Sequence, residues 1–305
     1  MRMTAVHETN LLIVGAGPAG IAAAVMADSL GMRSTLIEAG QVGGKLHHIG
    51  ALENMPGNWQ TGPALADALA ADIARITQSA RCRLLRGCAV RVDGHDHHVE
   101  VGLDDGQVLT AAAAVVATGV TTLAPQHTDW VTVPEGLWAP PLWRACPEDL
   151  HGVTYVIGAD RPLGTWLRAH PHVQRTLNVL CPPEDDYKAA EVATDDRVRL
   201  LPVSRVVVME ARHSQGGWEI RAESRSGEQT AYVASTVLNN LGNRPSALKG
   251  LVQGSDGYCP PDQQHPRVLI AGDLRSARFQ RIITAQGSGA QAALARYYGT
   301  ALVTA

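Results

Sequence analysis

The sequence contains no Cys-x-x-Cys pair, no long apolar run and no strong net charge, and each absence excludes a class of protein. Its five cysteines in 305 residues are scattered and odd in number, which argues against a disulfide framework and against a zinc site. No apolar stretch reaches the roughly 18 residues of a membrane span. The opening segment MRMTAVHETN lacks the apolar region of a signal peptide, so we expect a cytoplasmic protein. A net charge of −3 gives no reason to expect nucleic acid or a membrane as a partner.

A glycine-rich motif stands out near the start of the chain. The apolar run 11–14 is typical of a strand buried on both faces, and small helix-forming residues occupy 21–30. Between them lies Gly15-Ala16-Gly17-Pro18-Ala19-Gly20. Gly15 permits the tight turn, Gly17 lets a pyrophosphate approach the backbone, and Gly20 lets the helix lie close to the sheet. The helix N-terminus then offers free N–H groups to phosphates.

A second apolar strand, 34–37, ends in Glu38. This acid lies at the distance past the glycines where a carboxylate binds the ribose hydroxyls of a dinucleotide. An incidental glycine-rich turn would explain the glycines but not the acid. The sequence therefore predicts a dinucleotide site.

The remaining pattern indicates two domains, which the chain is long enough to form. Residues 121–147 are rich in Pro and Trp without periodicity, as expected of a crossover. Residues 83–92 are predicted to form one strand. A second strand–turn unit follows at 153–158, with further strands at 198–201 and 203–209, and residues 239–245 lead back to a buried strand at 268–273. The dinucleotide domain is therefore predicted to be split by an inserted second domain.

Histidines cluster in the turn-prone segment 93–98. His95, His97 and His98 invite a metal-site interpretation, as do His47 and His48 elsewhere. Solvated histidines at a hairpin tip are the simpler interpretation, and we expect no bound metal.

Together these motifs resemble the low-molecular-weight thioredoxin reductases, two-domain flavoenzymes among the pyridine nucleotide–disulfide oxidoreductases. The loop 15–20 resembles their FAD pyrophosphate loop, and 43–46 with 53–57 resembles the GGQL…ENxPG segment that lines the flavin. Ala117-Thr118-Gly119 is similar to their ATG turn, and Ala271-Gly272-Asp273 to the closing AGD motif.

The resemblance implies an α/β fold of two Rossmann-like, three-layer β/β/α domains. It implies an FAD-binding domain at 1–122 and 246–305, with a degenerate NADPH-binding-like domain at 123–245, and a homodimer. The cofactor-binding residues that it implies are Gly15, Gly17, Pro18, Ala19, Gly20, Glu38, Gly43, Gly44, Lys45, Asn54, Val90, Thr118, Gly119, Gly272, Asp273, Arg281 and Ile282.

The chain departs from that family at its dithiol. Family members carry Cys-x-x-Cys just before the second nucleotide strand, where the matching stretch here is Trp143-Arg144-Ala145-Cys146. Because Trp143 replaces the first cysteine, no intramolecular dithiol can form there.

The second nucleotide loop departs as well. Residues 158–164 read GADRPLG, in which Asp160 takes the place of the middle glycine and Pro162 removes an N–H donor. The family's His-Arg-Arg at the 2′-phosphate corresponds to Cys181-Pro182-Pro183, followed by three acids at 184–186. Binding of a phosphate is therefore expected to be repulsive, and use of NADPH to be lost.

A flavin without a nicotinamide donor must take its electrons from a substrate or a protein. We expect an oxidase or an acceptor-linked dehydrogenase of a small molecule, in which the cofactor carries the redox step. Candidate bases are His47 and His48, since imidazole titrates near neutral pH. Trp143 could stack on the substrate or shield the flavin, or serve only in packing.

Two alternatives stay open. Cys146 could act as a monothiol toward a disulfide or a protein redox partner, with Arg144 as a neighbour that favours its thiolate. The chain could also be a non-catalytic flavin-binding dimer.

Overall fold

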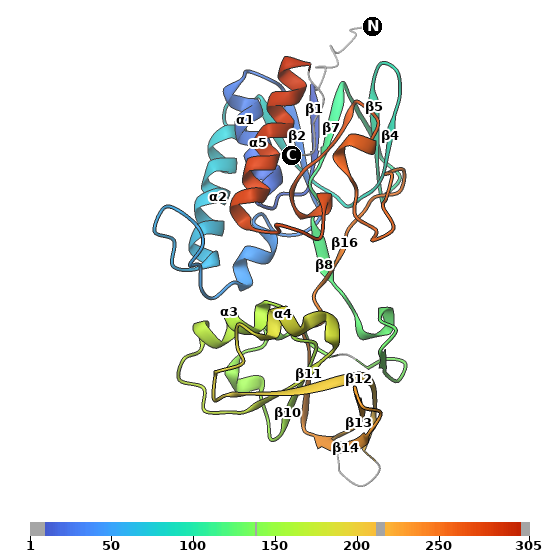
Figure 1. Cartoon of the computed structure of the whole chain (residues 1–305). Helices are drawn as coiled ribbons and strands as arrows, with labels where there is room; N and C mark the ends of the chain where they lie inside the picture. The colour runs from blue at the N-terminus through green and yellow to red at the C-terminus, as the bar shows by residue number, and fades with distance from the viewer. Residues whose placement is uncertain (1–9, 138, 212–216, 300–305) are drawn as a thin grey trace, which may run out of the picture. The chain divides into compact units, whose positions relative to one another are not determined.

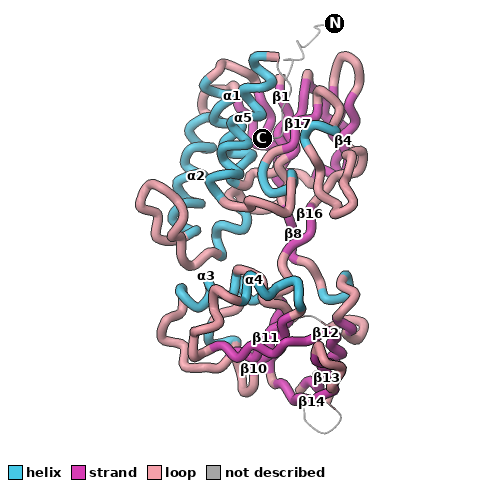
Figure 2. Tube along the Cα trace, in the orientation of Figure 1, coloured by secondary structure: helices cyan, strands magenta, loops and turns pink. Residues whose placement is uncertain are grey.

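The structure, a computed structural model, describes residues 10–137, 139–211 and 217–299, and the chain packs into two compact units (Figures 1 and 2). Unit 1 comprises Met1–His47, Leu52–Thr121 and Pro245–Ala305. Unit 2 comprises His48–Ala51 and Thr122–Arg244. The second unit is thus inserted in the sequence of the first.

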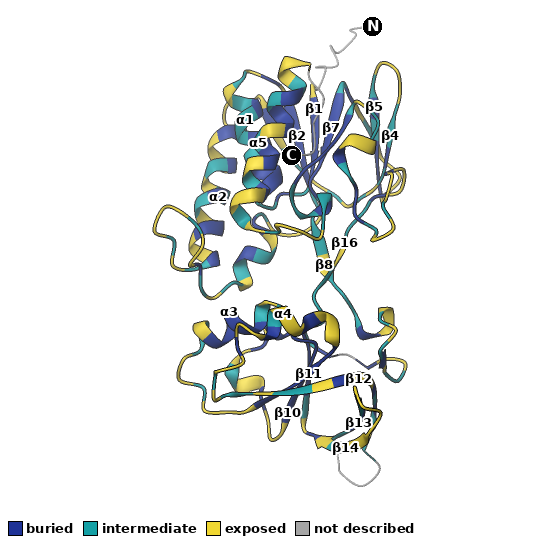
Figure 3. Ribbon diagram, in the orientation of Figure 1, coloured by how far each residue is buried: buried dark blue, intermediate teal, exposed yellow. Residues whose placement is uncertain are grey.

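Unit 1 is built on a parallel sheet of five strands in the order β17-β7-β1-β2-β3. In the central strand β1, Leu11 pairs with Ser34 of β2 on one side and with Ala113 of β7 on the other. Both faces of this sheet are covered, which is why its central strands are almost wholly apolar and buried (Figure 3). The strands are β1 (Leu11–Val14), β2 (Ser34–Glu38), β3 (Cys82–Arg86), β7 (Ala113–Val116) and β17 (Val268–Ile270).

Helices cover one face of this sheet and a second sheet covers the other, giving three layers (Figure 1). The helices are α1 (Pro18–Ser29), α2 (Gly62–Thr77) and α5 (Ile282–Tyr298), and α1 lies against both of the others. The second sheet is antiparallel, in the order β4 (Ala89–Gly94), β5 (Val99–Leu103) and β6 (Val108–Ala111). Val92, Val99 and Val101 from this sheet pack with Val14 and Val116 in one apolar core. This is the β/β/α layering that the sequence resemblance implied.

Unit 2 combines a parallel and an antiparallel part in one sheet, in the order β14-β13-β12-β11-β10-β15, with β9 paired to β12. The strands are β9 (Val131–Thr132), β10 (Thr154–Ile157), β11 (Leu177–Cys181), β12 (Val198–Glu210), β13 (Trp218–Ser224), β14 (Gln229–Ala234) and β15 (Thr236–Asn239), with helices α3 (Pro162–Ala169) and α4 (Asp186–Ala189). β10 pairs in parallel with β11 and β15, and β11 with β12. A separate two-stranded ladder joins β8 (Val120–Thr122) to β16 (Asn243–Pro245).

The α/β fold class is confirmed, while two strand predictions needed correction. The run 83–92 was expected to be one strand, but it divides at Gly87 and Cys88 into β3 and β4, which join different sheets. The stretches 198–201 and 203–209 were expected to be two strands, but β12 runs through Pro202 as one. A register shift between Val203 and Arg205 accommodates the change there from parallel to antiparallel pairing.

No helix among the described residues combines the length and the apolar character needed to cross a bilayer.

Candidate functional site

The glycine loop of unit 1 leaves the carboxyl end of β1 and enters α1 with no room for side chains on its inner side. Gly15 has φ +99°, and a Cβ there would lie 2.5 Å from the Ala117 carbonyl oxygen. A Cβ on Gly20 would lie 1.7 Å from the Gly15 oxygen, so the first turn of α1 rests directly on the loop. Gly17 differs, because no described atom lies within 4 Å of its Cβ position. The backbone at Gly17 is therefore open to an approaching ligand, as a pyrophosphate requires.

Glu38 ends the neighbouring strand β2 and turns its carboxylate to this loop. Its Oε2 accepts a hydrogen bond from the Ala16 N–H at 2.6 Å, and its Oε1 accepts one from the Gly40 N–H at 2.7 Å. Each carboxylate oxygen has lone pairs left for further donors. The acid is thus fixed beside the glycine loop.

The segment after Glu38 folds back onto the same loop. The Gly43 N–H donates to the Ala16 oxygen at 2.8 Å, and a Cβ on Gly43, which has φ +88°, would lie 2.9 Å from the Ala66 Cβ. Lys45 lies in the 3-10 turn Gly44–His48 that follows. His47 from that turn places its Nε2 2.8 Å from the Val42 oxygen. Because a carbonyl only accepts, the His47 Nε2 carries the proton and its Nδ1 is the nitrogen left for other chemistry.

Two further strand ends close the site. The Thr118 hydroxyl donates to the Ser246 oxygen at 2.7 Å and holds the turn after β7, where Gly119 has φ +63°. Past β17, a Cβ on Gly272 would lie 2.9 Å from the Ala19 Cβ. Burial raises the pKa of the neighbouring Asp273 carboxyl, and the positive charges of Lys45 and Arg281 oppose that rise.

The structure therefore brings most of the predicted cofactor residues together at the carboxyl ends of β1, β2, β7 and β17. Arg281 caps the start of α5, and Ile282 is its first residue. Asn54 lies in an exposed bend of the 50–60 loop, and Val90 lies 44% exposed on β4. No described contact joins these last two side chains to the glycine loop.

The loop of unit 2 begins like that of unit 1. Gly158 has φ +89°, and a Cβ there would lie 2.6 Å from the Asn240 oxygen. Asp185, near the end of β11, accepts a hydrogen bond from the Ala159 N–H at 2.9 Å, in the manner of Glu38 with Ala16. The two units thus share one backbone design up to this point.

Beyond Ala159, an ion-pair cluster of Asp160, Lys188 and Asp185 occupies the loop of unit 2. The Lys188 Nζ lies 2.9 Å from Asp160 Oδ1 and 2.8 Å from Asp185 Oδ1, with all three side chains less than 20% exposed. Burial by itself lowers the pKa of Lys188, but the two carboxylates outweigh it and raise that pKa above its ordinary range. We call Asp160, Lys188 and Asp185 the charge lock. It lies at the position corresponding to Gly17, the open backbone of unit 1.

The acidic run 184–186 is also paired within the unit. Asp186 accepts from two nitrogens of Arg225, at 2.5 and 2.8 Å, and Asp185 belongs to the charge lock. The sequence suggested three unopposed negative charges, whereas two of them are neutralised by cations that the motif does not include. Leu163 replaces the third glycine of the motif and is buried in the core of unit 2.

The predicted catalytic residues are divided between the two units. His48 and Trp143 both belong to unit 2 and meet edge to face, with ring centroids 5.1 Å apart. The Trp143 Nε1–H donates to Thr122 Oγ1 at 3.3 Å, and the Arg144 guanidinium lies 4.6 Å from the Trp143 ring. Arg144 thus stacks on the tryptophan. His47 belongs to unit 1.

All five cysteines are free thiols, and they divide by exposure. Cys88 and Cys146 are exposed, while Cys82, Cys181 and Cys259 are buried. Burial, followed by the charges of Asp185 and Asp186, raises the pKa of Cys181 to about 11, and burial likewise raises that of Cys259 to about 11.

We expect a thiol reagent at pH 8 to modify two cysteines of the native protein rapidly. Burial denies the reagent access to Cys82, Cys181 and Cys259 and raises the pKa of each thiol. For Cys181 and Cys259, a pKa of about 11 leaves roughly one molecule in a thousand ionised at pH 8. Peptide mass mapping should find Cys88 and Cys146 labelled before denaturant is added, and all five afterwards. Rapid native labelling of Cys181 would contradict the described burial.

Sequence reasoning missed the partners of the second loop. Lys188, Arg225 and Asn240 carry no motif, and Asn240 holds the loop through an Nδ2–H donated to the Asp160 oxygen at 2.8 Å. The only available indication was Lys188 three residues after Asp185, a spacing that places two side chains on one face of a helical turn.

The architecture defines a class: an α/β protein of two Rossmann-like units, with an open glycine loop in the first and a closed loop in the second. Comparison with known proteins agrees with this class. Residues 9–134 match the family model described as pyridine nucleotide-disulphide oxidoreductase.

Curated relatives match nearly the whole chain at low identity. Thioredoxin reductase of Mycolicibacterium smegmatis is 25% identical, covering 95% of both chains. The bifunctional thioredoxin reductase/thioredoxin of Mycobacterium leprae is 25% identical over 94% of this chain, and an alkyl hydroperoxide reductase component of Pseudomonas putida is 27% identical over 97%. The chain spans 65% and 59% of the lengths of these last two.

Solved structures show the same fold. Thioredoxin reductase from Lactococcus lactis superposes with a TM-score of 0.75 at 18% identity, covering 95% of this chain and 98% of that one. The T. acidophilum thioredoxin reductase gives 0.73, also at 18% identity, with coverage of 95% and 98%. The resemblance to thioredoxin reductase-like pyridine nucleotide–disulphide oxidoreductases is thereby confirmed.

Proposed function

We propose that this chain is an FAD-dependent oxidoreductase that works without NADPH and without a redox dithiol. Its substrate would be a small molecule, and oxygen or another acceptor would take up the electrons. The observation that carries the proposal is the contrast between the two glycine loops. Where Gly17 leaves the backbone open in unit 1, the charge lock fills the corresponding place in unit 2.

The residues of unit 1 fit FAD. Gly15, Gly17 and Gly20 form a cradle that side chains would fill, and Glu38 is fixed where a ribose would bind. The positive charge of Lys45 acts on the buried Asp273 carboxyl. When bound, FAD supplies a group that accepts two electrons, and the protein supplies position and a base. The proposed bases are His47 and His48. The Nε2 of His47 is bound to the Val42 oxygen, so its Nδ1 would act, and the ring of His48 packs against Trp143.

The residues of unit 2 do not fit a nicotinamide dinucleotide. A pyrophosphate would have to displace the Asp160 carboxylate from Lys188, and Pro162 at the start of α3 offers no N–H. Lys188 and Arg225 are already engaged by carboxylates, while the guanidinium of Arg161 in the loop lies 6.0 Å from the Tyr187 ring. Binding at Asp160 would therefore cost the existing ion pairs of Lys188.

Anaerobic mixing with NADPH tests the proposal. We expect the purified FAD-loaded protein to keep its flavin absorbance in excess NADPH or NADH over minutes, and to bleach fully with dithionite. Calorimetry with NADP⁺ gives a second readout and should show no binding. Rapid bleaching by NADPH would refute the proposed independence from this donor, and a protein that does not take up FAD would refute the cofactor assignment.

The Cys146 alternative is tested by one substitution. Cys146 is exposed, and its N–H donates to Asp149 Oδ2 at 2.8 Å. Under the main proposal, Cys146→Ser leaves flavin reduction by the substrate nearly unchanged. Loss of a disulfide reductase activity in this variant would favour the monothiol alternative, and turnover of no substrate in either form would favour a non-catalytic flavin-binding dimer.

A further inference from the structure

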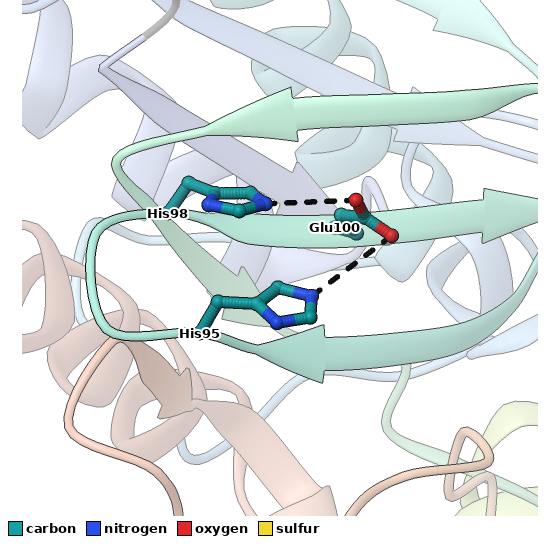
Figure 4. A group of neighbouring side chains, drawn as sticks. All are labelled: His95, His98 and Glu100. Atoms are coloured by element: carbon teal, nitrogen blue, oxygen red, sulfur yellow. Dashed lines mark ion pairs between the residues drawn. The ribbon is translucent and has the colours of Figure 1, made fainter.

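The tip of the β4–β5 hairpin gathers His95, His98 and Glu100 on one face (Figure 4). His95 and His98 flank the two-residue turn formed by Asp96 and His97, and the His95 N–H donates to the His98 oxygen at 2.9 Å. The two histidines therefore stand opposite each other across the turn. Their rings stack with centroids 4.5 Å apart and planes 18° apart.

Strand alternation places Glu100 beside them. Side chains two residues apart on a strand share a face, so Glu100 follows His98 on the exposed side of β5. The neighbouring residues Val99 and Val101 are fully buried on the opposite side, which fixes the register. The core packing thus presents both histidines and the acid together.

The two imidazoles point to different oxygens of one carboxylate. His98 Nε2 lies 3.5 Å from Glu100 Oε1, and His95 Nε2 lies 4.0 Å from Oε2, as Figure 4 shows. One ligand atom from each residue can be chosen so that all lie within 4.8 Å of one another. Bond lengths of about 2.0 to 2.1 Å put the ligands of tetrahedral zinc roughly 3.3 Å apart, so modest side-chain rotations would close the set.

The neighbouring charges leave Glu100 available. Arg91 lies 3.9 Å from Glu100 Oε2, but its guanidinium is paired with Asp93 at shorter range. Within the described ranges, no group donates a hydrogen bond to the Glu100 carboxylate. With neutral histidines, Arg91, Asp93 and Glu100 leave this face with one net negative charge, which favours a cation.

We propose that His95, His98 and Glu100 bind Zn²⁺, with water completing the coordination. Two imidazoles and a carboxylate suit zinc and disfavour Mg²⁺ and Ca²⁺, which prefer ligand sets made of oxygen. Three protein ligands with an open position form a known kind of zinc site. A groove of about 560 Å³, lined by His95, Glu100 and His265 among others, admits water beside the cluster. This proposal replaces the interpretation of solvated turn histidines.

Zinc titration of the untagged, full-length chain tests the site. By calorimetry at pH 7.5 we expect one Zn²⁺ per chain and none with Mg²⁺. Glu100→Gln, which keeps the shape but removes the charge, should weaken binding at least about tenfold, since loss of even a supporting partner costs that much. His97→Ala, at the same turn but outside the cluster, is the matched control and should bind as the unaltered chain does.

Lowering the pH gives an independent readout. Because imidazole must be neutral to bind a metal, zinc should be released as the pH falls from about 7.5 to about 5.5. The proposal is overturned if the unaltered chain binds no zinc, or if Glu100→Gln and His97→Ala bind zinc equally. Circular dichroism of each variant shows whether it is folded, and His98→Ala serves in place of Glu100→Gln if the latter is not.

Discussion

Replacing Gly20 with alanine is expected to destabilise unit 1 by at least about 4 kcal/mol, because the new methyl group has no place to go. Its Cβ would lie 1.7 Å from the Gly15 oxygen, which is backbone and cannot rotate away. The expected loss in free energy of unfolding exceeds the roughly 1 to 3 kcal/mol of ordinary overpacking. It is a large share of the roughly 5 to 15 kcal/mol that stabilises a domain. Urea unfolding followed by circular dichroism measures the loss.

Two glycines provide controls. Gly17→Ala meets no described neighbour within 4 Å and has an ordinary φ of −80°, so the free energy of unfolding should change by less than about 0.5 kcal/mol. The same methyl group would obstruct a pyrophosphate, so FAD affinity should fall at least about tenfold. Gly287→Ala, in the open on α5, should be neutral or stabilising by up to about 1 kcal/mol. Equal stability of the Gly20 and Gly287 variants would contradict the described packing.

Replacing Lys188 with methionine is expected to cost about 3 kcal/mol in unit 2. The ammonium group lies between Asp160 and Asp185, whose side chains are only 15% and 9% exposed. Its removal leaves two close carboxylates uncompensated, and breaking a buried pair costs about 3 to 5 kcal/mol. Arg75→Met is the matched control, since Arg75 pairs with Asp72 on the exposed face of α2 and should cost about 0.5 kcal/mol or less.

The charge lock also predicts how stability depends on pH. The pKa of Lys188 is raised in the folded state, so its contribution is fully present below the unfolded value of about 10.4 and is lost as the pH rises through the folded value. The difference between the native chain and Lys188→Met should therefore stay constant from about pH 6 to about pH 9. It should shrink only at more alkaline pH, where Lys188 loses its proton. A stability difference that already falls between about pH 6 and about pH 9 would argue against the charge lock.

The fold could be predicted where local pattern and packing agree. The apolar run 11–14, the glycine loop and Glu38 specify a strand, turn, helix and strand without help from the rest of the chain. The prediction was wrong at 83–92, because strand propensity does not say when a chain leaves one sheet for another. The sequence predicts a strand boundary at Pro202, yet this residue lies within β12, beside the point where the pairing partners change.

Site residues could be predicted only where a residue type at that position usually has one structural role. Glycines and a strand-end acid marked the open loop, but Lys188 and Arg225 are ordinary cations until the fold brings them to Asp160 and Asp186. Glu100 was missed for a similar reason. Its place beside His98 follows from strand alternation, while its approach to His95 depends on the tight turn that reverses the chain.

The split of unit 1 has a consequence for the order in which the chain folds during synthesis. Strand β17 and helix α5 come from the segment that begins at Pro245, and a Cβ on Gly289 of α5 would lie 1.9 Å from the Ala19 oxygen of α1. The ribosome must therefore release residues beyond Gly289 before α1 can pack against α5. By then all of unit 2 has emerged from the ribosome, so unit 2 can fold first. Unit 1 is completed only when β17 and α5 pack beside the glycine loop.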